Sequence, residues 1–304
     1  MSILVVGGGR WGKVHARTLI EMEELYGVED VRDDALFPLQ DQFGGSIVHT
    51  IDATYRWVPD TNHKEPPEGV VVATPSFSHG WEARRWLNRG IPALVEKPVA
   101  CTLSDLNGFA SFPTDSLMAG HLLVFSPQYS KLKEILDGTK ENVLSINFVR
   151  RKNSPNREEG VFLSLAVHDI ALADYLLSGI EYCSGEVIHN ATNTTAMASL
   201  RCRALNRMVT LNGLWSFDIG IPKREVVVVT NDATYIVLEG KSLTSFSRSE
   251  DGLVVRADYT TSTTPPLTLE LEHFIQGIRQ GREFLTGRDH IFRTYSVVFN
   301  ALGV

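Results

Sequence analysis

The sequence predicts an α/β fold: an N-terminal Rossmann domain with a doubly wound parallel sheet, then an α+β domain with a large, mostly antiparallel open sheet. Three observations predict it. Short apolar runs alternate with helix-like segments up to about residue 120, a glycine-rich turn follows the first run, and long strand-like runs dominate after about residue 140. The 304 residues suggest about two domains. We place them at residues 1–122 and 123–304.

The first domain is expected to begin with a strand at Ile3–Val6. Apolar residues then recur at helical spacing from Trp11 to Leu25, and Gly27 is expected to end this helix. The apolar residues of Gly69–Ala73 do not alternate with polar ones, which indicates a strand buried on both faces. Further strands are expected at 28–31, 93–96 and 117–121, and helices at 36–43, 79–89 and 127–136. This alternation predicts βαβ units and a parallel sheet.

In the second domain, strand follows strand, which predicts a mostly antiparallel sheet with helices on one face. Strands are expected at 143–151, 196–203, 208–216, 225–230, 233–238 and 253–259, and helices at 167–177, 267–279 and 291–302. Val226–Val229 is apolar at every position, so both of its faces are expected to be covered. A second copy of the chain could cover one of them.

Composition excludes several classes of function. The chain has 29 Lys and Arg against 36 Asp and Glu, a net charge of −7, which argues against a nucleic-acid partner. No apolar run approaches the ~20 residues that cross a bilayer. No basic region precedes the first apolar run, so a secretory signal is not expected. The three widely spaced cysteines suggest neither a disulfide framework nor a metal site, and a cytoplasmic location is the simplest interpretation.

Gly7, Gly9 and Gly12 form a G-x-G-x-x-G motif between the first strand and the first helix. Glycine allows a tight turn, close approach of the backbone to a pyrophosphate, and close packing of helix on strand. The phosphates would lie at the helix N-terminus, beside Arg10 and Trp11, where free N–H groups favour negative charge. The motif predicts a dinucleotide site. A glycine-rich turn without a ligand is the alternative.

Asp30 follows Gly12 by 18 residues, at the end of the second expected strand. A carboxylate there would bind the ribose hydroxyls of NAD and repel the 2′-phosphate of NADP. Arg32 could accept that phosphate, so NADP stays possible. Alternatively, Asp30, Asp33 and Asp34 solvate a turn.

Glu96-Lys97-Pro98 follows a buried strand, and in open α/β sheets ligands bind outside the carboxyl ends of the strands. Lys97 could there hydrogen-bond a reacting oxygen and stabilise its negative charge. A loop lysine paired with Glu96 is the alternative.

These motifs together resemble the Gfo/Idh/MocA oxidoreductase family. The resemblance runs over nearly the whole chain and rests on GGGRWGKVHARTL at the start, VVATPSFSH at 71–79, VEKPVACTLSDL at 95–106, AGHLLVFSP at 119–127, VHDIALADYLL at 167–177 and LELEHFIQGIRQGREFLT at 269–286. It implies an NAD(P)-dependent oxidoreductase that transfers a hydride between nicotinamide and a sugar-like or nucleotide-sugar substrate. It also implies a homodimer or homotetramer formed through the open sheets.

The resemblance assigns further site residues by position. Thr74, Pro75 and His79 would line the cofactor side of the cleft, and Glu96 and Lys97 would lie near the nicotinamide ribose. His168 matches the family's active-site histidine, and a neutral imidazole there could take a hydroxyl proton as hydride leaves the same carbon.

One position departs from the family pattern. Ser164 stands where an aspartate usually lies one helical turn before the histidine, and Ala171 stands where another acid is common. Ser164 could still touch the substrate or His168, because residues four apart share a helix face. Asp169 would point about 100° away from His168. The loss of carboxylates leaves two alternatives open: a dinucleotide-binding sensor or regulatory protein with reduced or no catalysis, and an imine or bile-pigment-type reductase.

A basic cluster of Arg150, Arg151, Lys152 and Arg157 precedes this region. It is either a solvated loop or an anion clamp for a phosphorylated or nucleotide-linked substrate, with Arg157 as a substrate contact. Core packing is the simplest role for Trp215, although it could stack on a sugar ring. No metal site is expected, since the remaining histidines lack ligand spacing with Cys or Asp.

Overall fold

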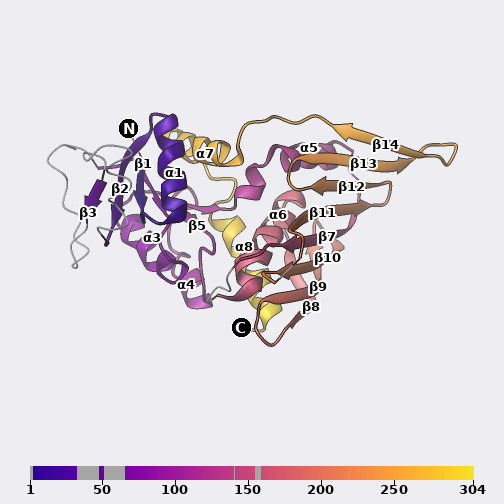
Figure 1. Cartoon of the computed structure of the whole chain (residues 1–304), viewed down its shortest axis with the longest axis horizontal. Helices are drawn as coiled ribbons and strands as arrows, with labels where there is room; N and C mark the ends of the chain where they lie inside the picture. Colours follow the sequence, from indigo (N-terminus) through magenta and orange to yellow (C-terminus); the bar gives the residue numbers. More distant parts are fainter. Residues whose placement is uncertain (1–2, 33–47, 51–65, 140, 155–158, 219) are drawn as a thin grey trace. The chain divides into compact units, whose positions relative to one another are not determined.

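The structure is a computed structural model, and it describes residues 3–32, 48–50, 66–139, 141–154, 159–218 and 220–304. Two compact units make up the chain (Figure 1). The first comprises residues 1–120 and 267–289, and the second comprises residues 121–266 and 290–304. The predicted boundary after residue 122 lies close to the first crossing. The predicted contiguous second domain differs, because residues 267–289 return to the first unit.

The first unit is a six-stranded parallel sheet in the order β3-β2-β1-β4-β5-β6. Its strands are β1 (Ile3–Val6), β2 (Leu25–Asp30), β3 (Val48–Thr50), β4 (Gly69–Val72), β5 (Ala93–Glu96) and β6 (Leu117–Gly120). Its helices are α1 (Arg10–Glu21), α3 (His79–Leu87), α4 (Leu103–Asn107) and α7 (Pro266–Gln280). All residues of β1, β4, β5 and β6 are buried. This confirms the predicted Rossmann-type sheet, covered on both faces.

The second unit is an eight-stranded sheet in the order β14-β13-β12-β11-β7-β10-β9-β8, in which only the β7–β10 pair is parallel. Its strands are β7 (Val143–Arg151), β8 (Glu181–His189), β9 (Thr195–Ala204), β10 (Arg207–Ser216), β11 (Lys223–Thr230), β12 (Ala233–Leu238), β13 (Ser242–Arg248) and β14 (Val254–Tyr259). Its helices are α5 (Pro127–Thr139), α6 (Val167–Leu176) and α8 (Arg288–Leu302). Val226 and Val228 are buried, whereas Val227 and Val229 stay partly exposed on the opposite face. The strand pairing confirms the predicted, mostly antiparallel sheet.

Several predicted boundaries were wrong for physical reasons. The first helix ends at Glu21, and Leu25 and Gly27 lie in β2, because the left-handed backbone at Glu23 (φ 60°) redirects the chain. The edge strand β8 was missed because its exposed residues carry little apolar pattern, and β13 because serine and threonine interrupt it. The short elements β3 and α4 were also missed. The expected helix at 36–43 lies outside the described residues.

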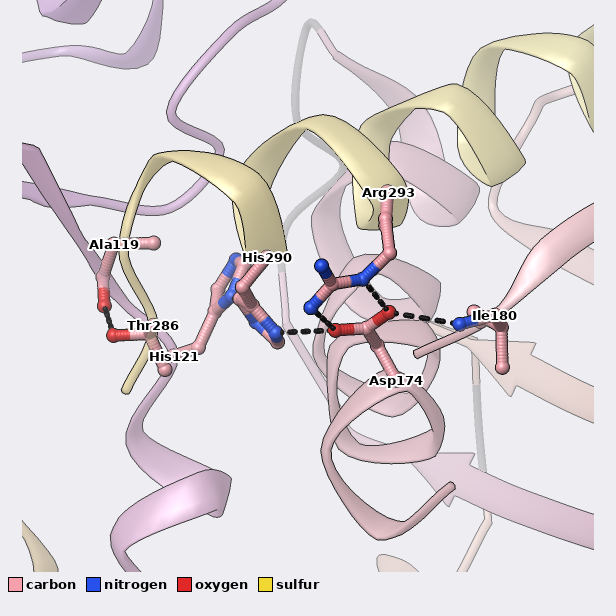
Figure 2. A network of polar contacts seen from close by, with 7 residues as sticks. All are labelled: Ala119, His121, Asp174, Ile180, Thr286, His290 and Arg293. Atoms are coloured by element: carbon pink, nitrogen blue, oxygen red, sulfur yellow. Dashed lines mark hydrogen bonds and ion pairs between the residues drawn. The ribbon is translucent and has the colours of Figure 1, made fainter. Parts of the chain in front are cut away.

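Buried polar contacts anchor helix α8 and the loop that precedes it (Figure 2). In the first unit, the Thr286 hydroxyl donates to the Ala119 carbonyl oxygen at 2.8 Å. In the second unit, Asp174 of α6 accepts hydrogen bonds from the His290 ring, the Arg293 guanidinium and the Ile180 N–H. Burial alone would raise the pKa of Asp174, but the bonds from His290 and Arg293 lower it below its ordinary value. Asp174 therefore stays ionised and links α6 to α8.

A second buried ionic cluster lies in the first unit, where β2 meets α3. Arg85 lies 2.5 Å from a carboxylate oxygen of Glu29 and 2.8 Å from one of Glu82. Burial raises the pKa of Glu82 to about 7, against the opposing charge of Arg85, and the charge of Glu29 adds to the rise. One arginine thus serves two buried carboxyl groups, and Glu82 keeps its proton most readily.

We predict that this cluster makes stability fall as the pH rises. Between pH 4.5 and about 7 the folded state holds the Glu82 proton more tightly than the unfolded chain does. The unfolding free energy should therefore drop by up to about 3 kcal/mol across this window. Glu82→Gln should flatten the slope in urea unfolding at a series of pH values. Glu134→Gln, at an exposed side chain of α5, is the control. An unchanged slope in Glu82→Gln would contradict the role assigned to Glu82.

Candidate active site

The glycine loop connects β1 to α1 as the motif predicts. Gly7 adopts a left-handed backbone (φ 105°), and a Cβ there would lie 2.7 Å from the Ala73 carbonyl oxygen. A Cβ on Gly12 would lie 1.7 Å from the Gly7 carbonyl oxygen, so only glycine lets α1 pack against the loop. A Cβ on Gly9 would meet no described atom within 4 Å. Gly9 therefore borders open space at the helix N-terminus, where a diphosphate would approach.

Asp30 lies at the end of β2 and reaches back to this loop. Its carboxylate accepts the Gly8 N–H at 2.7 Å and the Arg32 N–H at 2.9 Å. The Arg32 guanidinium lies farther off, 3.7 Å from the same carboxylate, and its side chain is 62% exposed. A negative charge thus stands at the turn where the ribose of a dinucleotide would lie. Together with the open Gly9, this carboxylate fits an NAD-type cofactor. Asp33 and Asp34 lie outside the described residues.

Two polar side chains, Ser78 and His79, make hydrogen bonds to the residues that follow β4. Ser78 donates to the Thr74 hydroxyl and the Pro75 carbonyl, each at 2.8 Å. His79 is 2% exposed, and its two ring nitrogens lie within 2.8 Å of the Pro98 and Thr74 carbonyl oxygens. Thr74 and Pro75 keep exposed surface and remain predicted cofactor contacts. The buried ring of His79 instead holds the backbone of two neighbouring loops together.

Glu96 and Lys97 end β5 at the same edge of the sheet. The Glu96 carboxylate receives the His15 Nε2 at 2.8 Å and the Lys97 N–H at 3.3 Å, and the Lys97–Pro98 peptide is cis. Burial alone would raise the pKa of Glu96, but the hydrogen bond and charge of His15, with the charge of Lys97, lower it. Glu96 is therefore an ionised, buried anchor. The half-buried Lys97 is left as the residue of this motif that can reach a ligand.

In the second unit, His168 lies in the first turn of α6 and is half-buried. The side chain of its neighbour Asp169 is buried in the core. The Asp169 carboxylate pairs with Arg150 of β7, and it also accepts the Trp215 indole N–H of β10 at 2.7 Å. Asp169 is therefore committed to the sheet and cannot replace the carboxylate that the family pattern places before His168.

Two expectations for this region change. The segment Phe162–Ala166 forms a π-helical turn ahead of α6, with i→i+5 hydrogen bonding, so the argument that Ser164 and His168 share an α-helical face does not apply. Ser164 is 1% exposed. Arg150 was considered for an anion clamp, but it lies on the buried face of β7 in its pair with Asp169. Arg157 lies outside the described residues, so its role as a substrate contact stays a prediction.

Sequence reasoning missed two residues. His15 was overlooked because a histidine within a helix carries no signal of its own; its place on the buried face of α1, three residues after Gly12, was the available clue. Arg150 lies on the same face of β7 as the apolar Ile146 and Phe148, with one residue between each pair. That period of two could have placed Arg150 in the core.

The N-terminal part of this architecture matches a known family. Residues 1–111 match the family model for an oxidoreductase family with an NAD-binding Rossmann fold. These residues therefore match the Gfo/Idh/MocA oxidoreductase family. Inositol 2-dehydrogenase 1 from Saccharopolyspora erythraea is 24% identical to this chain over 302 residues, and the match covers 91% of the chain and 86% of that protein.

Solved structures share the fold of this chain over its full length. A UDP-N-acetylglucosamine 3-dehydrogenase from Acidithiobacillus ferrooxidans is 19% identical, with a TM-score of 0.82, and the match covers 100% of this chain and 96% of that one. An oxidoreductase from Agrobacterium radiobacter, in complex with NAD+, L-tartaric acid and magnesium, is 16% identical, with a TM-score of 0.81, and the match covers 100% and 95%. The predicted two-domain fold is confirmed, and the match over residues 1–111 agrees with the predicted family.

Features that would suggest another class of protein are lacking in the described ranges. None of the helices there combines the length and apolar character of a membrane span. No group of His, Cys, Asp and Glu within the same ranges could hold a metal ion. None of the three cysteines forms a disulfide bond in the described part of the chain.

We predict that two alanine substitutions in the glycine loop separate folding from ligand binding. Gly12→Ala should lower the melting temperature, because its Cβ collides with the Gly7 carbonyl. Gly9→Ala should melt like the unsubstituted protein yet bind NAD at least about tenfold more weakly, since its methyl group enters the space left for the diphosphate. Thermal unfolding and isothermal titration with NAD test both. Unchanged NAD affinity in Gly9→Ala would contradict this placement of the ligand.

Proposed function

We propose that this oxidoreductase is an NAD-dependent dehydrogenase of a ring-shaped polyhydroxy substrate, either a cyclic polyol or a nucleotide-linked sugar. The observation that carries the proposal is the shared edge of the parallel sheet. Asp30 is the last residue of β2, and Thr74 and Lys97 come just after β4 and β5. All three lie at the carboxyl ends of the strands, around the switch point beside β1. The printed names of the relatives, inositol 2-dehydrogenase and UDP-N-acetylglucosamine 3-dehydrogenase, support the substrate class.

NAD, when bound, supplies the hydride acceptor. The glycine loop and the N-terminus of α1 would hold its diphosphate, and Asp30 its ribose. Lys97 would donate a hydrogen bond to the reacting hydroxyl oxygen and stabilise the negative charge that grows there. His168 would accept the hydroxyl proton as the C–H bond gives up its hydride. The substrate carbon is thereby oxidised from alcohol to ketone, and the reverse reaction uses the same groups in the opposite order.

We predict that Lys97→Met lowers kcat about 100-fold or more, since general acid–base and electrostatic assistance each contribute factors of this size. The affinity for NAD should stay within about threefold. The measurement is NADH formation with a panel of inositols and UDP-sugars, beside NAD titration of the free enzyme. Lys131→Met is the matched control, because Lys131 of α5 pairs with the exposed Glu134. Full kcat in Lys97→Met would remove the lysine from the mechanism.

Preference for NAD over NADP follows from the Asp30 carboxylate at the glycine loop. Removing a hydrogen bond to a charged group costs about 1.5–3 kcal/mol. Asp30→Ala should therefore weaken NAD binding about 10- to 100-fold and improve binding of NADP. Arg32→Ala tests the competing interpretation. If Arg32 holds a 2′-phosphate, its loss should weaken NADP selectively, and a native preference for NADP would overturn our assignment.

We further propose that two copies of the chain associate through the outer face of the eight-stranded sheet. Exposed or partly exposed apolar side chains from five strands gather on that face, namely Val149, Met197, Leu214, Val227, Val229 and Ile236. Uncharged polar residues continue the face, with the Asn212 amide donating to the Asn147 amide oxygen at 2.9 Å. Contiguous apolar surface of this kind is typical of an interface between subunits.

We predict that Val227→Lys dissociates this oligomer, because a charge buried without a partner is costly. Analytical ultracentrifugation measures the change in mass. Leu205→Lys, at an exposed hairpin tip, should leave the mass unchanged. A monomeric unsubstituted protein would reject the interface.

A further inference from the structure

Lys97 stands between two residues that are each tied to a buried histidine from another part of the chain. On one side, His15 of α1 places its Nε2 2.8 Å from the Glu96 carboxylate. On the other side, His79 at the start of α3 places its Nδ1 2.8 Å from the Pro98 carbonyl oxygen. The residues immediately before and after Lys97 are thus fixed by different helices.

His79 has a second contact that extends this arrangement. Its Nε2 lies 2.7 Å from the Thr74 carbonyl oxygen, so one ring bridges the loop after β4 and the loop after β5. His15 is 0% exposed and His79 is 2% exposed. Neither ring has the surface to contact a ligand, so any influence on the reaction must pass through the backbone and carboxylate they hold.

The protonation of His79 decides how many of these bonds form. Both acceptors are carbonyl oxygens, so only the doubly protonated ring donates to both, and a neutral ring donates to one. Burial lowers the pKa of His79, while the two carbonyl bonds and the charge of Glu96 oppose this and the charge of Lys97 adds to it. Each bond needs a proton on its own ring nitrogen. A substitution that keeps the donor at one nitrogen and removes the donor at the other therefore tests each bond separately.

The neighbouring strand β6 comes close to Glu96 on its other side. A Cβ on Gly120 would lie 3.3 Å from the Glu96 Cα and 3.6 Å from its carboxyl carbon, so a glycine at this position leaves the space that the Glu96 side chain occupies. The hydrogen bond from His15 satisfies one carboxylate oxygen and the Lys97 N–H approaches the other. The main chain on both sides of Lys97 is therefore held in place by neighbouring elements.

We propose that His15 and His79 are positioning residues for Lys97, which hold Glu96 and Pro98 so that the lysine ammonium meets the reacting oxygen. This inference rests on the proposed function of Lys97 as the group that polarises that oxygen. A misplacement of about 1 Å at a reacting group can cost about 100-fold in rate, so loss of either bond should act on kcat.

The hydrogen bond to be tested is made by Nδ1 in His79 and by Nε2 in His15. Of asparagine and glutamine, the substitution that keeps the bond at one histidine therefore removes it at the other. An asparagine amide can replace the Nδ1 donor of histidine, and a glutamine amide reaches the place of Nε2. His79→Asn keeps the donor to Pro98, and His79→Gln loses it. His15→Gln keeps the donor to Glu96, and His15→Asn loses it. We predict that His79→Gln and His15→Asn lower kcat about 10- to 100-fold, whereas the conservative variants stay within about threefold of the unsubstituted enzyme.

Two further measurements separate positioning from general damage. NAD affinity should change less than about threefold in all four variants. The rate at which acetic anhydride labels Lys97 in the protein without NAD, read by mass spectrometry across pH, should shift in His79→Gln and His15→Asn only. His273→Asn, whose amide does not reach the place of Nε2 and so loses the hydrogen bond from the Leu285 N–H in the same unit, is the control for a lost histidine bond.

The outcomes distinguish this inference from the proposed function. Equal loss of kcat in both variants at one position, or loss in none, would overturn the positioning role. So would an equal fold-loss from His79→Gln in a Lys97→Met background, since the histidine would then act elsewhere. Full kcat in Lys97→Met would instead reject the function proposed for the lysine, while the labelling shift still tests its positioning. Ring ¹⁵N shifts of the unsubstituted protein test the bonds without any variant, because they require a proton on Nδ1 of His79 and on Nε2 of His15.

Discussion

Glu96 places a carboxylate at the end of a buried strand, where its desolvation has to be offset by specific partners. An unpaired buried charge is strongly destabilising, and removing one partner of a buried pair typically costs several kcal/mol. His15 and the Lys97 N–H supply those partners, and the pKa of Glu96 is lowered in spite of its burial. Burial and the charge of Glu96 raise the pKa of nearby Glu270 well above its ordinary value. That second carboxyl stays neutral, so the first unit holds one buried negative charge here rather than two.

In the second unit, the buried carboxylate of Asp169 is likewise stabilised by specific partners. Asp169 lies on the buried side of α6, directly after His168, and its carboxylate is shared by Arg150 and Trp215 from two neighbouring strands. Burial alone would lower the pKa of Arg150, but Asp169 raises it, so the guanidinium stays charged. The pair fixes the rotation of α6 on its sheet. His168 thereby takes its orientation on the helix from a buried neighbour.

The fold followed from the sequence because its strongest signals are periodic. Unbroken apolar runs such as Gly69–Val72 mark strands covered on both faces, and alternation along β9 marks a sheet with two different faces. The return of α7 to the first unit could not be predicted, since an amphipathic helix shows which face it buries but not against which sheet. Isolated side chains were hardest to place. His79 was expected to line a ligand and is buried, and His15 drew no attention, because a single polar residue has no periodicity.

Helix α1 combines the two tasks that the candidate site requires. Its first turn presents the free N–H groups beside Gly9, and its buried face carries Gly12 against the loop and His15 against Glu96. A helix of this length moves as one body, so a ligand that settles at its N-terminus bears on the same element that fixes the residue before Lys97. Diphosphate binding and the placement of the lysine therefore share one rigid support. This explains why the glycine motif and the Glu-Lys-Pro motif, far apart in sequence, are informative together.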